Sequence, residues 1–269
     1  MNFEVGGRRA FAYTAAHELD PAKPTVVFVH GAGLDHSSFG LQSRYFGYHG
    51  RNVLALDLPA HGRSEGPPLS NIQGMADWVS EVLKSLKIPK AAVVGHSMGS
   101  LVTLEFAARH PEQAERIAFI GVAFPMKVGA PFLEAAMAND YSAFDMHTIW
   151  GHAAQVPFAG NPNPGMWMYG DSLARLERLA PGVLHAGLKA CNDYAAGLES
   201  AARVKCPALF ILGGRDVMTP LRSTRTLQEK IAGAKTVEIA ACGHALMAEA
   251  PDATLDALIE FLSLEKPKG

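Results

Sequence analysis

Six short apolar segments recur along the chain, and they predict its architecture. Each segment is rich in β-branched residues and lacks strict alternation of apolar and polar positions, which is typical of strands that are covered on both faces. The expected strands are residues 25–30, 52–58, 91–95, 116–122, 207–213 and 236–240.

Segments with a helical spacing of apolar residues lie between several of these strands. Because strands and helices alternate, the chain is predicted to be an α/β protein with a doubly wound, mostly parallel sheet. The expected helices are residues 75–86, 100–110, 222–232 and 252–264.

The alternation stops between about residues 124 and 197, where helical patterns surround a proline-rich loop at 156–170. We expect this region to be a helical lid inserted over the sheet. Extra helices packed at the edge of the core are the alternative. The expected division is a first core part at 1–124, a lid at 125–196 and a second core part at 197–269.

Composition excludes several classes of protein and narrows the expected location. The 24 basic and 26 acidic residues nearly cancel and form no run of like charge, so no nucleic-acid partner is expected. The chain has neither an apolar signal segment at its start nor an apolar window long enough to span a membrane, which predicts a cytoplasmic protein without membrane association. Its three cysteines lack metal-ligand spacing, so reduced thiols are expected and neither a disulfide nor a metal site.

The segment GHSMG at residues 95–99 joins a predicted strand to a predicted helix. A strand that reverses into a helix within a few residues needs tight backbone geometry, and glycines on both sides of Ser97 leave room for it. Ser97 would then stand on a strained turn at the positive end of the helix, where a negative intermediate is favoured. The motif indicates a nucleophile, although Ser97 could also be a small residue that starts a helix.

A serine hydroxyl needs a base to become nucleophilic, and the base needs an orienting acid. Asp216 and His244 follow two successive predicted strands, in the chain order Ser, Asp, His. Taken alone, Asp216 also fits a helix cap, a task that Thr219 before Pro220 performs better, and His244 also fits a packed loop histidine. Their positions at successive strand ends favour a shared catalytic role.

The segment HGAG at residues 30–33 follows the first strong strand. A glycine-rich turn at this position can direct backbone N–H groups toward Ser97, so the amides of Ala32 and Met98 are the expected donors of an oxyanion hole. Nucleotide binding is not favoured, because the loop has neither the GxxxxGK[ST] nor the GxGxxG pattern.

Five ordered segments together resemble the α/β-hydrolase superfamily, in particular its small lidded serine esterases and carbon–carbon hydrolases. The resemblance implies the α/β-hydrolase fold and a structural role for Asp57 and His61. Ala60 departs from the family, which usually carries glycine there. The segments are FVHGAGLDHSSF (oxyanion loop), LALDLPAHGRSEG, GHSMGS (nucleophile elbow), ILGGRDVMTP (acid loop) and ACGHALMAEAPD (histidine loop).

The resemblance implies a serine hydrolase without metal or cofactor. Its expected substrates are small to medium, mainly apolar carboxylic esters, or else lactones or thioesters, cleaved through an acyl-enzyme on Ser97. A serine rather than an aspartate at the elbow excludes haloalkane dehalogenases and epoxide hydrolases. A carbon–carbon hydrolase of dienoate-type ketones and a hydrolase-like ligand receptor with little turnover stay open, as does the oligomeric state.

The substrate pocket is expected among apolar side chains of the lid and the catalytic loops. Packing within the lid is an equally good interpretation of its aromatic residues and methionines. Arg175, Arg178 and Lys189 of the lid would suit a substrate carboxylate but also fit a solvated face. The spacing of the histidines matches no metal motif. The expected pocket residues are Leu34, Trp150, Met166, Trp167 and Met218.

Overall fold

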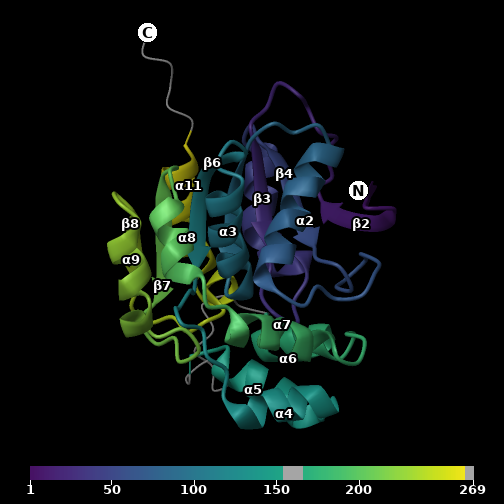
Figure 1. Ribbon diagram of the computed structural model, residues 1–269, viewed down its shortest axis with the longest axis vertical. Helices are drawn as coiled ribbons and strands as arrows, with labels where there is room; N and C mark the ends of the chain where they lie inside the picture. The colour runs from purple at the N-terminus through teal and green to yellow at the C-terminus, as the bar shows by residue number, and fades with distance from the viewer. Residues whose placement is uncertain (154–165, 264–269) are drawn as a thin grey trace.

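The computed structural model describes residues 1–153 and 166–263, which fold around one eight-stranded sheet (Figure 1). The strand order is β1-β2-β4-β3-β5-β6-β7-β8, and all neighbours pair in parallel except at β1 and β2, which are antiparallel. The strands are β1 Asn2–Val5, β2 Arg8–Tyr13, β3 Thr25–Val29, β4 Asn52–Asp57, β5 Ala91–His96, β6 Ala114–Ile120, β7 Ala208–Gly213 and β8 Lys235–Ile239.

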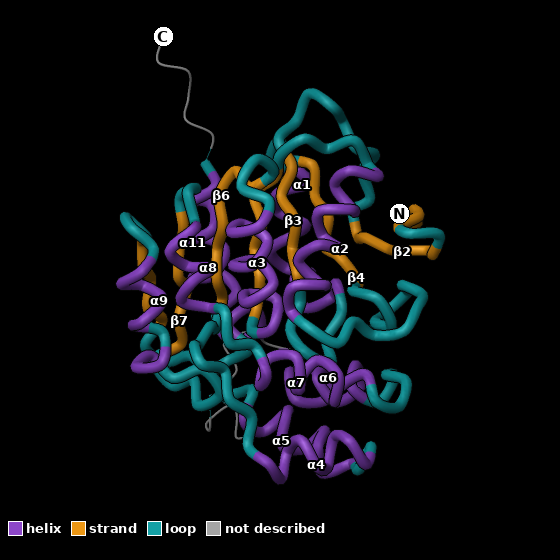
Figure 2. The backbone as a smooth tube through the Cα atoms, in the orientation of Figure 1, coloured by secondary structure: helices purple, strands orange, loops and turns teal. Residues whose placement is uncertain are grey.

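Helices cover both faces of the sheet (Figure 2). Successive residues of a strand point to opposite faces, so Val27 of β3 packs into the core beneath α2 and α3, whereas Phe28 packs beneath α1 and α11. One face carries α2 Ile72–Ser85, α3 Met98–Arg109, α8 Gly197–Arg203 and α9 Arg225–Lys230; the other carries α1 Gly40–Tyr48, α10 Leu246–Glu249 and α11 Pro251–Leu262.

The predicted fold class is confirmed, and all six expected strands form with their ends shifted by two residues or fewer. The expected helix at 222–232 is instead a short 3-10 turn at Leu221–Ser223 followed by α9. The expected strands and helices did not include β1, β2, α1, α8 or α10. The β1–β2 hairpin lies at the sheet edge, where charged residues interrupt the pattern, and α1 buries Gln42 and Ser43 in place of apolar side chains.

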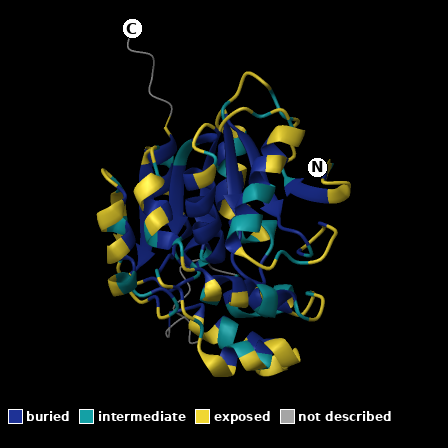
Figure 3. Ribbon diagram, viewed as in Figure 1, coloured by how far each residue is buried: buried dark blue, intermediate teal, exposed yellow. Residues whose placement is uncertain are grey.

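Among the described residues, five helices lie between β6 and β7 in the chain, and the first four of them lie at one end of the sheet (Figure 1). Strands β3, β4, β5 and β7 are buried along their whole length, whereas α4 buries only Phe132 and Ala136 (Figure 3). Residues 154–165 of the proline-rich loop lie outside the described residues, and the division at 125 and 196 stays a prediction. The four helices are α4 Ala130–Ala138, α5 Tyr141–Trp150, α6 Met168–Leu176 and α7 Val183–Asp193.

A buried carboxylate fastens the end of this insertion to the core. Glu105 of α3 accepts hydrogen bonds from the hydroxyls of Tyr194 and Ser200, both at 2.6 Å. Burial and the bond to Glu105 raise the pKa of Tyr194, so its phenol stays a donor. Among the described helices, none combines the length and apolar character that a membrane span needs.

The turn after β4 keeps a glycine-like conformation at an alanine. Ala60, which departs from the family pattern, has a φ of +68°. A left-handed conformation at a non-glycine residue costs roughly 1–2 kcal/mol. The loop therefore adopts the geometry that glycine would allow. Because Ala60 has a Cβ atom, this conformation destabilises the folded protein.

We expect Ala60→Gly to raise the free energy of unfolding by about 0.5–1 kcal/mol, because the relief of strain exceeds the added freedom of the unfolded chain. Ala174→Gly is the matched control, since Ala174 is exposed within helix α6, where the same change should cost about 0.5–1 kcal/mol. Urea unfolding of both variants measures the effect. A loss of stability in Ala60→Gly equal to that of the control would show that the turn is not strained.

Candidate active site

Ser97 stands in the turn between β5 and α3 with φ +53° and ψ −117°. This backbone conformation is rare for a side chain other than glycine and costs on the order of 1–3 kcal/mol. Its amide donates to the Ile120 carbonyl at 2.9 Å, and its own carbonyl accepts from the Ser100 amide at 2.8 Å. The surrounding backbone thus holds Ser97 in the strained turn that the motif predicts.

Two glycines make this turn possible by close backbone approach. A Cβ atom on Gly95 would lie 2.0 Å from the carbonyl oxygen of Gly99, and one on Gly99 would lie 2.0 Å from that of Val29. Both distances are shorter than any real contact of a Cβ atom. Strand β5, helix α3 and strand β3 can meet here only because both side chains are absent.

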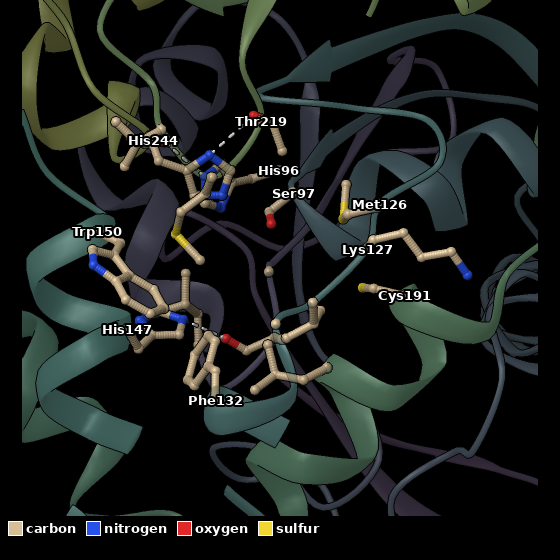
Figure 4. A pocket seen from close by; sticks show the side chains of 18 residues that line it. His96, Ser97, Met126, Lys127, Phe132, His147, Trp150, Cys191, Thr219 and His244 are labelled. Carbon is tan, nitrogen blue, oxygen red and sulfur yellow. Dashed lines mark hydrogen bonds between the residues drawn. The ribbon is translucent and has the colours of Figure 1, made fainter. Parts of the chain in front are cut away.

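Asp216 and His244 come together beside Ser97, although 28 positions separate them in the chain. Asp216 follows β7, His244 follows β8, and His244 Nδ1 donates to the Asp216 carboxylate at 2.7 Å. The second ring nitrogen, Nε2, has no hydrogen-bond partner within the described parts of the chain. Because Nδ1 carries the proton that binds Asp216, Nε2 of the neutral ring has a lone pair. The ring lies beside the Ser97 side chain (Figure 4).

The Asp216 carboxylate is held ionised by its neighbours. One oxygen accepts from the amides of Met218 and Thr219, both at 2.8 Å, and the other accepts from the Thr219 hydroxyl at 2.5 Å. Burial favours the neutral acid, but the electrostatic interaction with His244 and the hydrogen bonds from His244 and Thr219 outweigh it and lower the pKa of Asp216 to about 2. The Thr219 side chain was expected to cap the following helix; it makes no such cap and binds Asp216.

Three further contacts hold the backbone around His244. His96 donates from Nε2 to the His244 carbonyl at 2.9 Å, and Glu249 of α10 accepts from the Gly243 amide at 3.1 Å. The same Glu249 oxygen accepts from the Ala153 amide at 3.0 Å, which joins the histidine loop to the insertion. Sequence patterns did not single out these residues, because their contacts join segments far apart in the chain.

The amides of Ala32 and Met98 are available as donors. Both residues are buried, and neither amide donates a hydrogen bond to any residue that the structure describes. Gly187 of α7 packs against both: a Cβ there would lie 3.0 Å from the Ala32 Cβ and 3.2 Å from the Met98 sulfur. Two buried N–H groups without partners are the arrangement that stabilises an oxyanion.

Ser97 opens on a cavity of about 310 Å³. Figure 4 shows Ser97, His96 and His244 on one side of it, with Phe132 and His147 opposite. Its other lining residues include Ala32, Met126, Leu188 and Cys191. Burial raises the pKa of the Cys191 thiol to about 12, so the thiol stays protonated.

The five expected pocket residues divide between two cavities. Leu34, Trp150 and Met218 line the cavity that contains Ser97. Met166 and Trp167 line a neighbouring cavity of about 410 Å³, where Trp167 is 77% exposed. Four residues line both cavities, namely Leu34, His96, His147 and His244.

The basic residues of the insertion have different surroundings. The Arg175 side chain is 13% exposed, pairs with Asp171 and lines the neighbouring cavity. Lys189 pairs with Asp193 on the exposed side of α7, and Arg178 lies apart from both cavities. Of these three residues, only Arg175 therefore lines a cavity next to His244. Lys127 lines the Ser97 cavity, and its ammonium donates to the Asn192 carbonyl.

Asp35, His36 and Asp57 bring possible metal ligands within 4.8 Å of one another. Their oxygens already hold loops: Asp57 accepts from the amide and Nδ1 of His36 and from the Arg63 amide, each at 2.8 Å. Asp35 accepts from the Ser37 amide and hydroxyl. These contacts make a loop anchor at this position and support the structural role expected for Asp57.

Comparison with known proteins identifies relatives along almost the whole chain. The model of the family described as "Alpha/beta hydrolase family" matches residues 26–257. A 2-hydroxymuconate semialdehyde hydrolase of a Pseudomonas strain is 30% identical over 210 residues, which cover 72% of this chain and 70% of that protein. A pimeloyl-[acyl-carrier protein] methyl ester esterase of Aromatoleum aromaticum is 28% identical and aligns with 86% of this chain and 94% of its own.

A solved structure with the same fold is the enol-lactonase of Burkholderia xenovorans. It superposes with a TM-score of 0.85 at 24% identity and covers 98% of this chain and 100% of its own. At this identity the likeness shows a shared fold.

We expect the contribution of Asp216 to stability to depend on pH. Its pKa in the folded protein, about 2, is below the ordinary value, so the ionised carboxylate stabilises the fold above that ordinary value and the effect fades as pH falls. Relative to Asp216→Asn, the wild type should lose about 1 kcal/mol of unfolding free energy between pH 5 and pH 3. Urea unfolding of both proteins across this range measures the difference, and a constant difference would contradict the expectation.

Proposed function

The chain belongs to the alpha/beta hydrolase family, and from this premise we propose that it is a serine esterase acting through an acyl-enzyme on Ser97. The observation that carries the proposal is the convergence of a strained Ser97 and the hydrogen-bonded His244–Asp216 pair at one cavity. The proposed substrates are small to medium, mainly apolar carboxylic esters, with lactones and thioesters as chemically equivalent targets.

Acylation begins with His244 as general base. As the Ser97 Oγ attacks the ester carbonyl, Nε2 takes the hydroxyl proton, and the Asp216 carboxylate stabilises the imidazolium through Nδ1–H. The carbonyl oxygen becomes negative and accepts hydrogen bonds from the Ala32 and Met98 amides at the positive end of α3.

Collapse of this intermediate breaks the bond to the alcohol oxygen, which receives the proton from Nε2 and leaves as the free alcohol. A water molecule then attacks the acyl-serine while His244 again accepts a proton. The second intermediate breaks the bond to Ser97 Oγ, returns the proton to it and releases the carboxylic acid. His244 ends neutral, and the net reaction consumes one water.

The shape and lining of the cavity support an acyl group of modest size. A volume of about 310 Å³ lies at the lower end of small-molecule sites, and Leu34, Met126, Phe132 and Leu188 provide apolar walls. Each buried CH₂ group contributes about 0.8 kcal/mol to binding until the cavity is full. Activity should therefore rise with chain length and then fall.

We assign residues 125–196 as the lid. Helices α4, α5 and α7 contribute Phe132, Trp150 and Leu188 to the wall opposite Ser97, and Ala153 binds the histidine loop through Glu249. The insertion thereby sets the cavity dimensions, whereas the core supplies the reacting groups.

A second candidate is hydrolysis of a carbon–carbon bond in a dienoate-type ketone. Similarity to the 2-hydroxymuconate semialdehyde hydrolase favours it, as does Arg175, a largely buried cation at the neighbouring cavity. A substrate carboxylate at Arg175 would have to replace Asp171. The apolar lining of the Ser97 cavity fits simple esters better.

Ser97→Ala should lower kcat/KM on p-nitrophenyl esters by about 10⁴-fold or more, because it removes the attacking atom. It should also abolish the covalent adduct with a fluorophosphonate, measured by intact mass, while Tm stays close to wild type. The assay is run over acyl chains from acetate to decanoate, which also gives the chain-length optimum.

Ser100→Ala is the matched control for this experiment. Ser100 is fully buried in α3 and donates to the Gly95 carbonyl at 2.8 Å, so its loss should reduce stability yet leave the adduct intact. If wild type neither turns over any ester or lactone nor forms the adduct, the esterase proposal fails and a ligand receptor is favoured.

The two candidate reactions are separated by a substrate comparison. We expect the best p-nitrophenyl ester to exceed a vinylogous dienoate ketone in kcat/KM by at least about tenfold, because the lining of the Ser97 cavity is mainly apolar and the Lys127 ammonium in it already donates to the Asn192 carbonyl. Arg175→Gln should leave the ester rate within about twofold. A faster ketone reaction that Arg175→Gln slows would favour carbon–carbon hydrolysis.

A further inference from the structure

His147 of α5 is a polar side chain in a mostly apolar wall. It lines both cavities, together with Leu34, His96 and His244. Phe132 packs edge-on against its ring at a centroid distance of 6.4 Å, and Trp150 packs edge-on against Phe132 at 5.7 Å. The imidazole lies across the Ser97 cavity from Ser97 (Figure 4).

One hydrogen bond determines which nitrogen of His147 carries the proton. Nε2 lies 3.0 Å from the Ala32 carbonyl oxygen. A carbonyl oxygen only accepts, so Nε2 must be the N–H donor in this contact.

The second nitrogen is therefore an acceptor whenever the ring is neutral. Burial lowers the pKa of His147 to about 4, although the bond to Ala32 favours protonation; the nearby His244, His152 and Arg175 lower it further. Near neutral pH, Nδ1 thus carries a lone pair. No residue within 1–153 or 166–263 donates a hydrogen bond to it.

The imidazole that carries this acceptor is held close to the Ala32 backbone through its other nitrogen. The nitrogen and oxygen of one residue are at most about 3.6 Å apart, so His147 Nε2 lies within about 7 Å of the Ala32 amide. That amide is the proposed oxyanion donor. A group on the substrate that reaches the imidazole is consequently only a few bonds from the carbonyl carbon.

We propose that His147 is a specificity-determining residue whose Nδ1 accepts a hydrogen bond from the substrate, so that the site prefers esters and lactones with a hydroxyl or amide N–H near the reacting carbonyl. The inference rests on the proposed esterase function and narrows its substrate class. Such a site discriminates mainly against a ligand that cannot donate to Nδ1. When that ligand binds, Nδ1 is buried without a hydrogen bond and has lost its bond to water.

Three esters with the same four-carbon acyl chain and different groups at carbon 3 test the proposal. They are the p-nitrophenyl esters of butyrate, 3-hydroxybutyrate and 3-methoxybutyrate, of which only the second can donate. In wild type, kcat/KM for the hydroxy ester should exceed that for butyrate by about tenfold. The methoxy ester should have no higher kcat/KM than butyrate, because it has no hydrogen to donate. In His147→Phe the ratio of hydroxy ester to butyrate should fall to about one.

Two further variants separate recognition from a supporting role. His147→Gln keeps an N–H donor for the Ala32 carbonyl and an oxygen acceptor, so it should recover much of the preference. Phe132→Leu changes the shape of the same wall and leaves its polar groups in place. It should therefore change kcat/KM for all three esters by the same factor. The readout is the ratio between substrates, which a loss of loop support alone would not move.

Two results overturn the inference. The first is a kcat/KM ratio of hydroxy ester to butyrate near one in wild type. The second is the same ratio in His147→Phe as in wild type while kcat/KM for every ester falls equally. The second result would mean that His147 only supports the Ala32 loop. Fluorophosphonate labelling of each variant keeps the outcomes distinct. Wild type that neither labels nor hydrolyses ester contradicts the proposed function itself, whereas labelled, active protein without the preference contradicts only the role of His147.

Discussion

The close approach of three backbones around Ser97 is the constraint on which the rest of the site depends. Helix α3 begins directly after β5 and presses against β3, and the contact leaves no space for a Cβ atom at Gly95 or Gly99. Ser97 is thereby forced to a φ of +53°. Such strain persists only where surrounding structure determines it, and here the Ile120 carbonyl and the first turn of α3 do so.

The parallel sheet brings the other groups to this turn. Ala32 follows β3, Ser97 follows β5, Asp216 follows β7 and His244 follows β8. Because parallel strands end at the same edge, loops that are distant in sequence meet there without long connections. Hydrogen bonds also connect these loops to one another: His96 binds the His244 carbonyl, and Glu249 binds the Gly243 amide.

The insertion completes the site from the opposite side. Gly187 packs on Ala32 and Met98, His147 binds the Ala32 carbonyl, and Ala153 shares Glu249 with the histidine loop. The proposed lid therefore contacts the groups that would hold the oxyanion and the base, in addition to forming the wall. In this arrangement, a few contacts connect the wall of the cavity to the groups that are proposed to react.

Local patterns in the sequence were sufficient for the α/β class, the six strands and the loops that carry Ser97, Asp216 and His244, since apolar runs and glycine-rich turns act over short distances. They did not predict the β1–β2 hairpin or α1, whose burial depends on neighbours far along the chain. Tertiary structure alone decided that Met166 and Trp167 line the second cavity, apart from Ser97. It also decided that His147 meets the Ala32 carbonyl, a contact across 115 positions that no local spacing encodes.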